Sequence, residues 1–158
     1  MANTQAMTTS FMGELMTATH NFGVAPIRAA TTADTFKAAL YLASATVNAS
    51  TTGYSAVDEV SGAGYVAGGV VVTNATVPAS TNSSATAGVA YWTPSASITY
   101  TAVTLTTAFD AVLIYNSTQS NKAVSVHTFG SQTITAGTFT LTMPANTTTT
   151  ALLRLSTT

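Results

Sequence analysis

Alternation of hydrophobic and polar residues is the main pattern of this chain from residue 54 onward, and it predicts β-strands. Glycine, proline, asparagine and serine interrupt the alternating stretches and mark turns. The predicted strands cover residues 70–73, 89–92, 98–105, 109–115, 123–129, 133–136, 138–143 and 151–155. The run 109–115 is the most continuously apolar and predicts a central strand. We expect a turn at 116–121 and a hairpin around Gly137.

Residues 32–50 fit two kinds of secondary structure. Phe36, Leu40 and Ala43 share one face of a helix, whereas Phe36, Leu40 and Leu42 share one face of a strand. Periodicity alone does not decide between the two interpretations.

The first residues have a different pattern. Phe11, Met12, Leu15 and Met16 recur at helical spacing, which predicts a short amphipathic helix over residues 9–19. This segment either packs on the body of the protein or forms an arm that docks on a partner, with methionine and phenylalanine as adaptable anchors.

The chain as a whole is therefore predicted to be all-β. Short strands separated by regular turn signals are typical of a β-sandwich or jelly roll. We expect one such domain over residues 24–158, preceded by an N-terminal arm or short helix over residues 1–23.

Charge is unusually scarce. Of 158 residues only 6% are charged, against about a quarter in an average soluble domain, and the formal net charge is −1. Threonine is the commonest residue, followed by alanine and serine. Threonine suits pleated strands, and a surface of small uncharged residues favours association. The composition thus indicates β structure and assembly.

Composition also excludes several classes of protein. Four lysines and arginines cannot form the basic footprint that neutralises phosphates, so nucleic acid is not an expected partner. There is no cysteine for a disulfide framework. No apolar run approaches the roughly 20 residues that span a bilayer, so no membrane contact is expected. The N-terminus lacks the early positive charge and apolar core of a secretory signal.

The stretch GAGYVA at 62–67 matches the G-x-G-x-x-A pattern of dinucleotide-binding turns. Such a turn needs a following helix whose N-terminus faces the pyrophosphate. Here GGVVV follows at 68–72 and predicts a strand, and no acidic residue lies about 20 positions further on. We interpret the stretch as a turn before a strand and expect no cofactor.

Titratable residues are too few and scattered to form a recognisable catalytic or metal site. His127 and Asp110 lie in predicted strands, so a Ser-His-Asp set is conceivable, but no nucleophile turn accompanies it. Asp58 and Glu59 are adjacent and would point to opposite faces of a strand. We expect no catalytic residue and no metal, and therefore no enzyme.

Aromatic residues allow another interpretation. Tyr54, Tyr65, Tyr91, Trp92 and Tyr100 could stack on the apolar faces of sugars and form a glycan-binding platform. Packing in the core and at interfaces explains the same residues, and we favour it.

Four stretches occur in an order that resembles a family of small proteins encoded in the structural gene block of tailed-phage genomes. They read DTFKAALYLASATVNASTTGYS, EVSGAGYVAGGVVVTNATV, AVLIYNSTQSNKAVSVHTFGSQTITAGTFTLTMP and ALLRL. The EVSGAGY–AGG element and the segment VLIYN at 112–116 are the most specific parts. The resemblance covers most of residues 34–155 and favours a strand over 35–42.

This resemblance implies a virion protein of the head decoration or cement type. We expect a β-sandwich on the outside of the capsid that binds the major capsid protein, forms a homotrimer and assembles in the host cytoplasm. The residues expected to contact the shell or sister subunits are Phe11, Met12, Leu15, Met16 and Phe22. The alternative is a tail or head-fibre protein that binds a receptor glycan through an exposed cluster around Tyr91 and Trp92.

Overall fold

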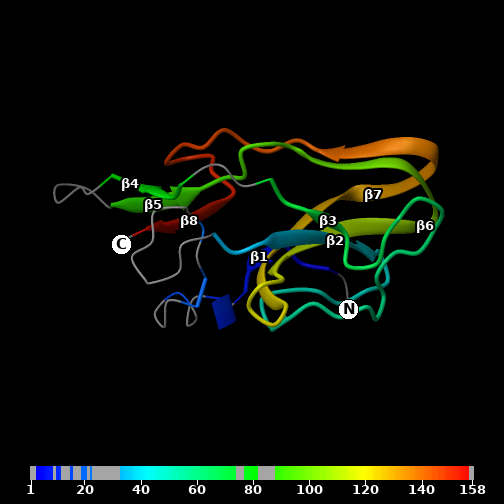
Figure 1. Cartoon of the computed structure of the whole chain (residues 1–158), viewed down its shortest axis with the longest axis horizontal. Helices are drawn as coiled ribbons and strands as arrows, with labels where there is room; N and C mark the ends of the chain where they lie inside the picture. The colour runs from blue at the N-terminus through cyan, green and yellow to red at the C-terminus, as the bar shows by residue number, and fades with distance from the viewer. Residues whose placement is uncertain are drawn as a thin grey trace.

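The computed structural model describes residues 3–8, 10–11, 15, 19–20, 22, 33–73, 77–81 and 88–156. As predicted, the fold is all-β and contains two antiparallel sheets, consistent with a β-sandwich domain. The strands are β1 (Ala6–Met7), β2 (Phe36–Leu42), β3 (Val70–Val71), β4 (Ala79–Ser80), β5 (Val89–Trp92), β6 (Ile98–Asn116), β7 (Lys122–Leu141) and β8 (Leu153–Ser156). The larger sheet has the order β1-β7-β6-β2-β3 and the smaller one β4-β5-β8 (Figure 1).

The two longest strands, β6 and β7, form a ribbon that folds back over itself. Its proximal half pairs residues 111–116 with 122–128, and its distal half pairs residues 98–105 with 134–141. Four register shifts lie between Tyr100 and Ala111, and such bulges bend a strand pair. Figure 1 shows the ribbon turning over at the right, so that the distal half lies above the proximal half.

The main hydrophobic core lies between these two layers. Val112 and Ile114 of the proximal half and Val103 of the distal half belong to the same buried cluster. The rings of Phe109 and Phe139 meet edge-on with their centroids 5.1 Å apart. A second cluster, which includes Leu113 and Tyr115, covers the opposite face of the proximal half. The proximal half is therefore buried on both faces.

Most of the predicted strands are present. β2 confirms the strand interpretation of residues 35–42, and β5 coincides with the strand expected at 89–92. The turn expected at 116–121 joins β6 to β7. The segment 109–115 is central, between β2 and β7, but it belongs to one long bulged strand that also contains 98–105.

The prediction of a hairpin around Gly137 is wrong. β7 runs through this position without reversing, and Gly137 pairs with Val103 of β6. The preceding Ala136 has a φ of +46°. The Ala-Gly pair therefore forms a bulge in a continuing strand, which uses the same left-handed backbone as a tight turn.

Candidate functional site

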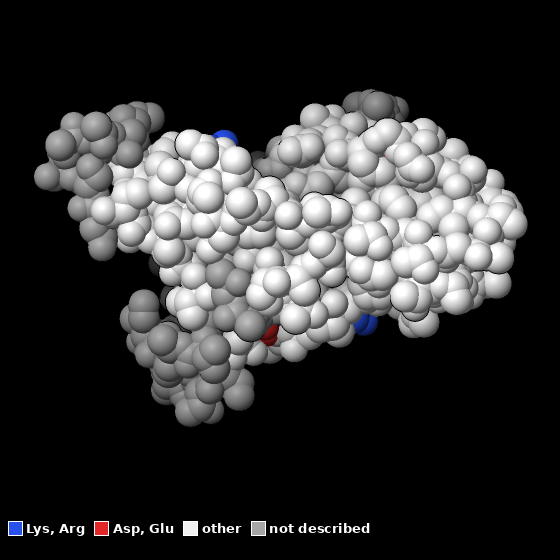
Figure 2. Space-filling model, turned by 90° about the horizontal axis from the view of Figure 1, so that it is seen from above, with Lys and Arg blue, Asp and Glu red and all other residues white. Residues whose placement is uncertain are grey.

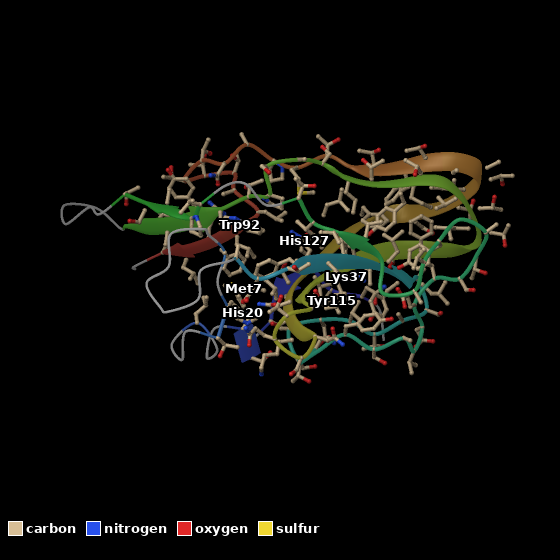
Figure 3. The ribbon with its side chains drawn as sticks, in the orientation of Figure 1. Met7, His20, Lys37, Trp92, Tyr115 and His127 are labelled. Atoms are coloured by element: carbon tan, nitrogen blue, oxygen red, sulfur yellow. The ribbon has the colours of Figure 1, made fainter. Side chains whose placement is uncertain are left out.

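The described residues of the N-terminal segment are anchored on the body of the protein by an aromatic cluster. The Phe22 ring stacks on Phe36 of β2 at a centroid distance of 4.5 Å and meets Trp92 of β5 edge-on at 4.8 Å. Phe11 lies 5.8 Å from Phe22 and 4.9 Å from His20. Figure 3 shows Trp92 above His20, with both near the middle of the view. Ring packing thus fixes where this segment meets the two sheets.

An apolar groove opens beside the aromatic cluster. Its volume is about 130 Å³, which is close to that of a cavity that holds a benzene-sized group. Leu155, on its lining, is 39% exposed. The groove is lined by Met7, Phe11, Leu15, Phe22, Pro78, Ala90, Tyr91, Trp92, Leu153 and Leu155.

Three of the five residues expected to contact a partner line this groove. They are Phe11, Leu15 and Phe22, whereas Met12 and Met16 lie outside the described residues. Phe11 and Phe22 are buried against the rings of their own chain, and Leu15 is half-buried. The interpretation that this segment packs on the body of the protein is therefore correct for the two phenylalanines. Contact with a partner stays a prediction. Phe11 and Leu15 have helical backbone, within the segment where a short helix was expected.

The exposed aromatic platform expected for glycan binding is not formed around Trp92. The Trp92 side chain is only 3% exposed, because it points from β5 into the core and packs on Phe22. Tyr100 is also buried, and its hydroxyl donates to the Ala38 carbonyl oxygen at 2.8 Å. Core packing is thus the correct interpretation of these two residues.

The glycine-rich stretch is a loop that packs against both β2 and the distal half of β6. A Cβ at Gly62 would lie 2.0 Å from the carbonyl oxygen of Thr104 in β6, and a Cβ at Gly69 would lie 1.7 Å from that of Ala38 in β2. Gly69 also has a φ of +68°. Strand β3 follows directly, as expected, in place of the helix that a dinucleotide-binding turn requires.

Glu59, to which the sequence pattern gave no role, is the centre of this loop's polar contacts. Its carboxylate accepts hydrogen bonds from the hydroxyls of Tyr54 and Tyr65, both at 2.7 Å, and from the Gly68 N–H at 2.8 Å. These donors replace water around a carboxylate that is only 9% exposed. Burial raises the pKa of Tyr65, and its hydrogen bond to Glu59 raises it further, so the hydroxyl stays a donor.

A polar cavity of about 440 Å³ lies between strands β1 and β7 on one side and residues 144 and 149–154 on the other. In its lining, the Ser125 Oγ lies 2.9 Å from the His127 Nε2. Burial lowers the pKa of His127 to about 4, so the imidazole is neutral at neutral pH. The Asp110 carboxylate instead accepts a hydrogen bond from the Asn3 side chain. The structure therefore does not assemble the conceivable Ser-His-Asp set.

The surface carries little charge. Figure 2 shows one face on which only isolated blue and red atoms interrupt the white surface. Within the described ranges, no three acidic or histidine side chains are grouped so that they could hold a metal ion. In the same part of the chain, no helix is long and apolar enough to cross a membrane.

Comparisons of this chain with protein-family models, with curated proteins and with solved structures found no match. Among the features described above, the apolar groove is the one that coincides with the partner contacts expected from the sequence.

Proposed function

We propose that this chain is a decoration, or cement, protein of a tailed-phage head. It binds the outside of the shell and stabilises contacts between major capsid subunits. The observation that carries the proposal is the apolar groove, on which Phe11, Leu15 and Phe22 converge. The resemblance of the sequence to small phage virion proteins, the all-β fold and the scarcity of charge support it.

In this mechanism, an apolar side chain of the shell enters the groove beside Leu155. Burying one aliphatic or aromatic side chain contributes about 1.5–3 kcal/mol, which is too little for stable binding alone. A homotrimer would present three grooves to neighbouring capsid subunits, and linked contacts raise the overall avidity. Because the described residues of the groove lining include no charged side chain, we expect binding to depend weakly on salt.

The test uses empty shells that lack this protein. Purified chain is mixed with the shells, and the bound fraction is measured after sedimentation. Leu155→Asp places a charge at the rim of the groove, and the matched control Val57→Asp places one at a side chain that is 72% exposed and outside the groove. Both sites are exposed, so both variants should keep the wild-type circular dichroism spectrum.

We expect Leu155→Asp to weaken shell binding by about tenfold or more, because the charge must be desolvated in an apolar recess. Val57→Asp should bind as the wild type does. Equal binding by Leu155→Asp and the wild type would contradict docking through the groove. The alternative of a glycan-binding fibre protein requires an exposed cluster around Tyr91 and Trp92, and the buried Trp92 ring does not favour it.

A further inference from the structure

The polar cavity differs in chemistry from the apolar groove, although the two lie on neighbouring parts of the same strands. Met7 and Leu153 belong to the linings of both. Beyond them, the cavity exposes hydroxyl, imidazole and guanidinium groups, whereas the described lining of the groove consists of apolar and aromatic residues. Shell docking through the groove leaves these polar groups without a function.

Ser125 and His127 give the cavity a hydrogen-bond donor that is fixed in place. Their side chains share one face of β7, and the Oγ–Nε2 distance is 2.9 Å. If the serine hydroxyl donates to Nε2, the neutral imidazole carries its proton on Nδ1 and can donate from there. If Nε2–H donates instead, the serine hydroxyl proton is left for a ligand. In both tautomers, one donor of the pair remains.

Arg154 is the only charged side chain among the described residues that line the cavity. One of its terminal nitrogens donates to the Thr148 carbonyl oxygen at 3.3 Å, which ties the guanidinium to the adjacent loop. A guanidinium has five N–H donors, so most of them remain for a ligand. Its planar fork matches the paired oxygens of a carboxylate or a phosphate. Among the described residues of the lining, no acidic side chain offsets this positive charge.

The loop that forms the outer wall is held in shape by its own hydrogen bonds. Thr147 Oγ1 and Thr150 Oγ1 are 2.6 Å apart, and Thr150 Oγ1 donates to the Ala145 carbonyl oxygen at 2.8 Å. A wall that is ordered before binding lowers the entropy that a ligand must overcome.

We propose that this cavity binds a small oxyanion, in which a carboxylate or phosphate group pairs with Arg154 and accepts a hydrogen bond from the Ser125–His127 pair. The site is independent of shell binding, because the groove and the cavity differ in every charged and hydroxyl-bearing residue that the proposal uses.

The experiment follows the imidazole signals of the full-length protein by NMR at neutral pH. The chain has only two histidines, so the His127 signals can be assigned by comparison with a His127→Gln variant. Succinate and inorganic phosphate are titrated separately at constant ionic strength, with chloride as the balancing anion. The same titrations are made with Arg154→Gln, which changes an exposed side chain, and with Lys122→Gln as a cation control outside the cavity.

A saturable shift of the His127 signals by either probe, weakened about tenfold or more in Arg154→Gln and unchanged in Lys122→Gln, supports the site. A response to succinate alone identifies a carboxylate site, and a response to phosphate alone identifies a phosphate site. The proposal is overturned if neither probe gives a saturable shift. It is also overturned if Arg154→Gln responds as strongly as the wild type.

Discussion

The proximal and distal halves of the β6–β7 ribbon belong to the same two strands but are covered differently. In the proximal half, every β6 residue from 111 to 116 is buried, because hydrophobic clusters cover both faces. In the distal half, buried Ile98 and Tyr100 alternate with exposed Thr99 and Thr101. The apolar run in the sequence therefore reflects burial of both faces of the proximal half. The alternating pattern reflects burial of only one face of the distal half.

The glycine-rich loop contacts both of these regions. Gly69 packs against β2 beside the proximal half, and Gly62 packs against β6 in the distal half. Glu59 holds the loop in this position through Tyr65 and Gly68. Changes in the loop and in each half of the ribbon therefore test whether the two halves depend on each other.

The largest effect is expected from Gly69→Ala. The new Cβ would lie 1.7 Å from the Ala38 carbonyl oxygen, and the backbone is in the left-handed region that alanine disfavours. We expect a loss of at least about 4 kcal/mol in the free energy of unfolding, or failure to fold, measured by urea denaturation. Gly130→Ala in the bend of β7 is the control, because its Cβ would meet no atom within 4 Å. Similar stability of the two variants would show that the loop is not packed on β2.

Leu113→Ala tests the double covering of the proximal half. This side chain is fully buried on the face opposite the main core, so its truncation should cost about 2–5 kcal/mol. Thr140→Ala changes an outward position of the distal half and should cost less than about 0.5 kcal/mol. Thermal and chemical denaturation measure both. Equal costs would mean that the outer faces of the two halves are equally covered.

Glu59→Gln should loosen the loop without creating a cavity. The amide replaces one acceptor oxygen with a donor group, so part of the three-donor arrangement is lost, at a cost of about 2–3 kcal/mol. Amide hydrogen exchange should accelerate first at Thr104, which donates its N–H to the Ala63 carbonyl oxygen of this loop. Asp58→Asn makes the same chemical change at an exposed neighbour and should leave stability and exchange unchanged. An equal loss of stability in both variants would contradict the conclusion that Glu59 holds the loop in place.

A smaller, pH-dependent effect is expected from His127 in the proximal half of β7. Burial lowers its pKa to about 4 in the folded state, below the value of 6.5 expected when the chain is unfolded. The unfolded state therefore binds the proton first, so stability is fully present above pH 6.5 and is lost as the pH falls toward 4. The two pKa values set an upper limit of about 3 kcal/mol on this loss. His127→Gln should flatten this part of the stability profile, and an unchanged slope would contradict the assignment.

The sequence predicts the fold class and most strands because alternation and apolar runs reflect burial directly. It does not predict the outcome at Gly137, because a bulge and a hairpin use the same local residues and only the pairing with Val103 distinguishes them. The inward orientation of Trp92 depends on Phe22 and Phe36, which are distant in the sequence.

For a similar reason, the sequence predicts some residues of the candidate sites and not others. Helical spacing of apolar residues identified Phe11 and Leu15, which do line the groove. No pattern in the sequence predicts the polar cavity. Ser125 and His127 alternate along a strand as many polar residues do, and the cavity forms only because residues 149–154 lie opposite them in the fold. Glu59 likewise gains its donors only when the loop folds back on it.

The most direct test of the proposed shell decoration is the copy number of this chain in purified particles of the phage proposed to encode it. Quantitative mass spectrometry, with isotope-labelled peptides of this chain and of the major capsid protein, gives the ratio. Decoration of the whole shell predicts a value near one copy per major capsid subunit. A few copies per particle, or none, would contradict it, and a few copies would instead indicate a tail or vertex fibre.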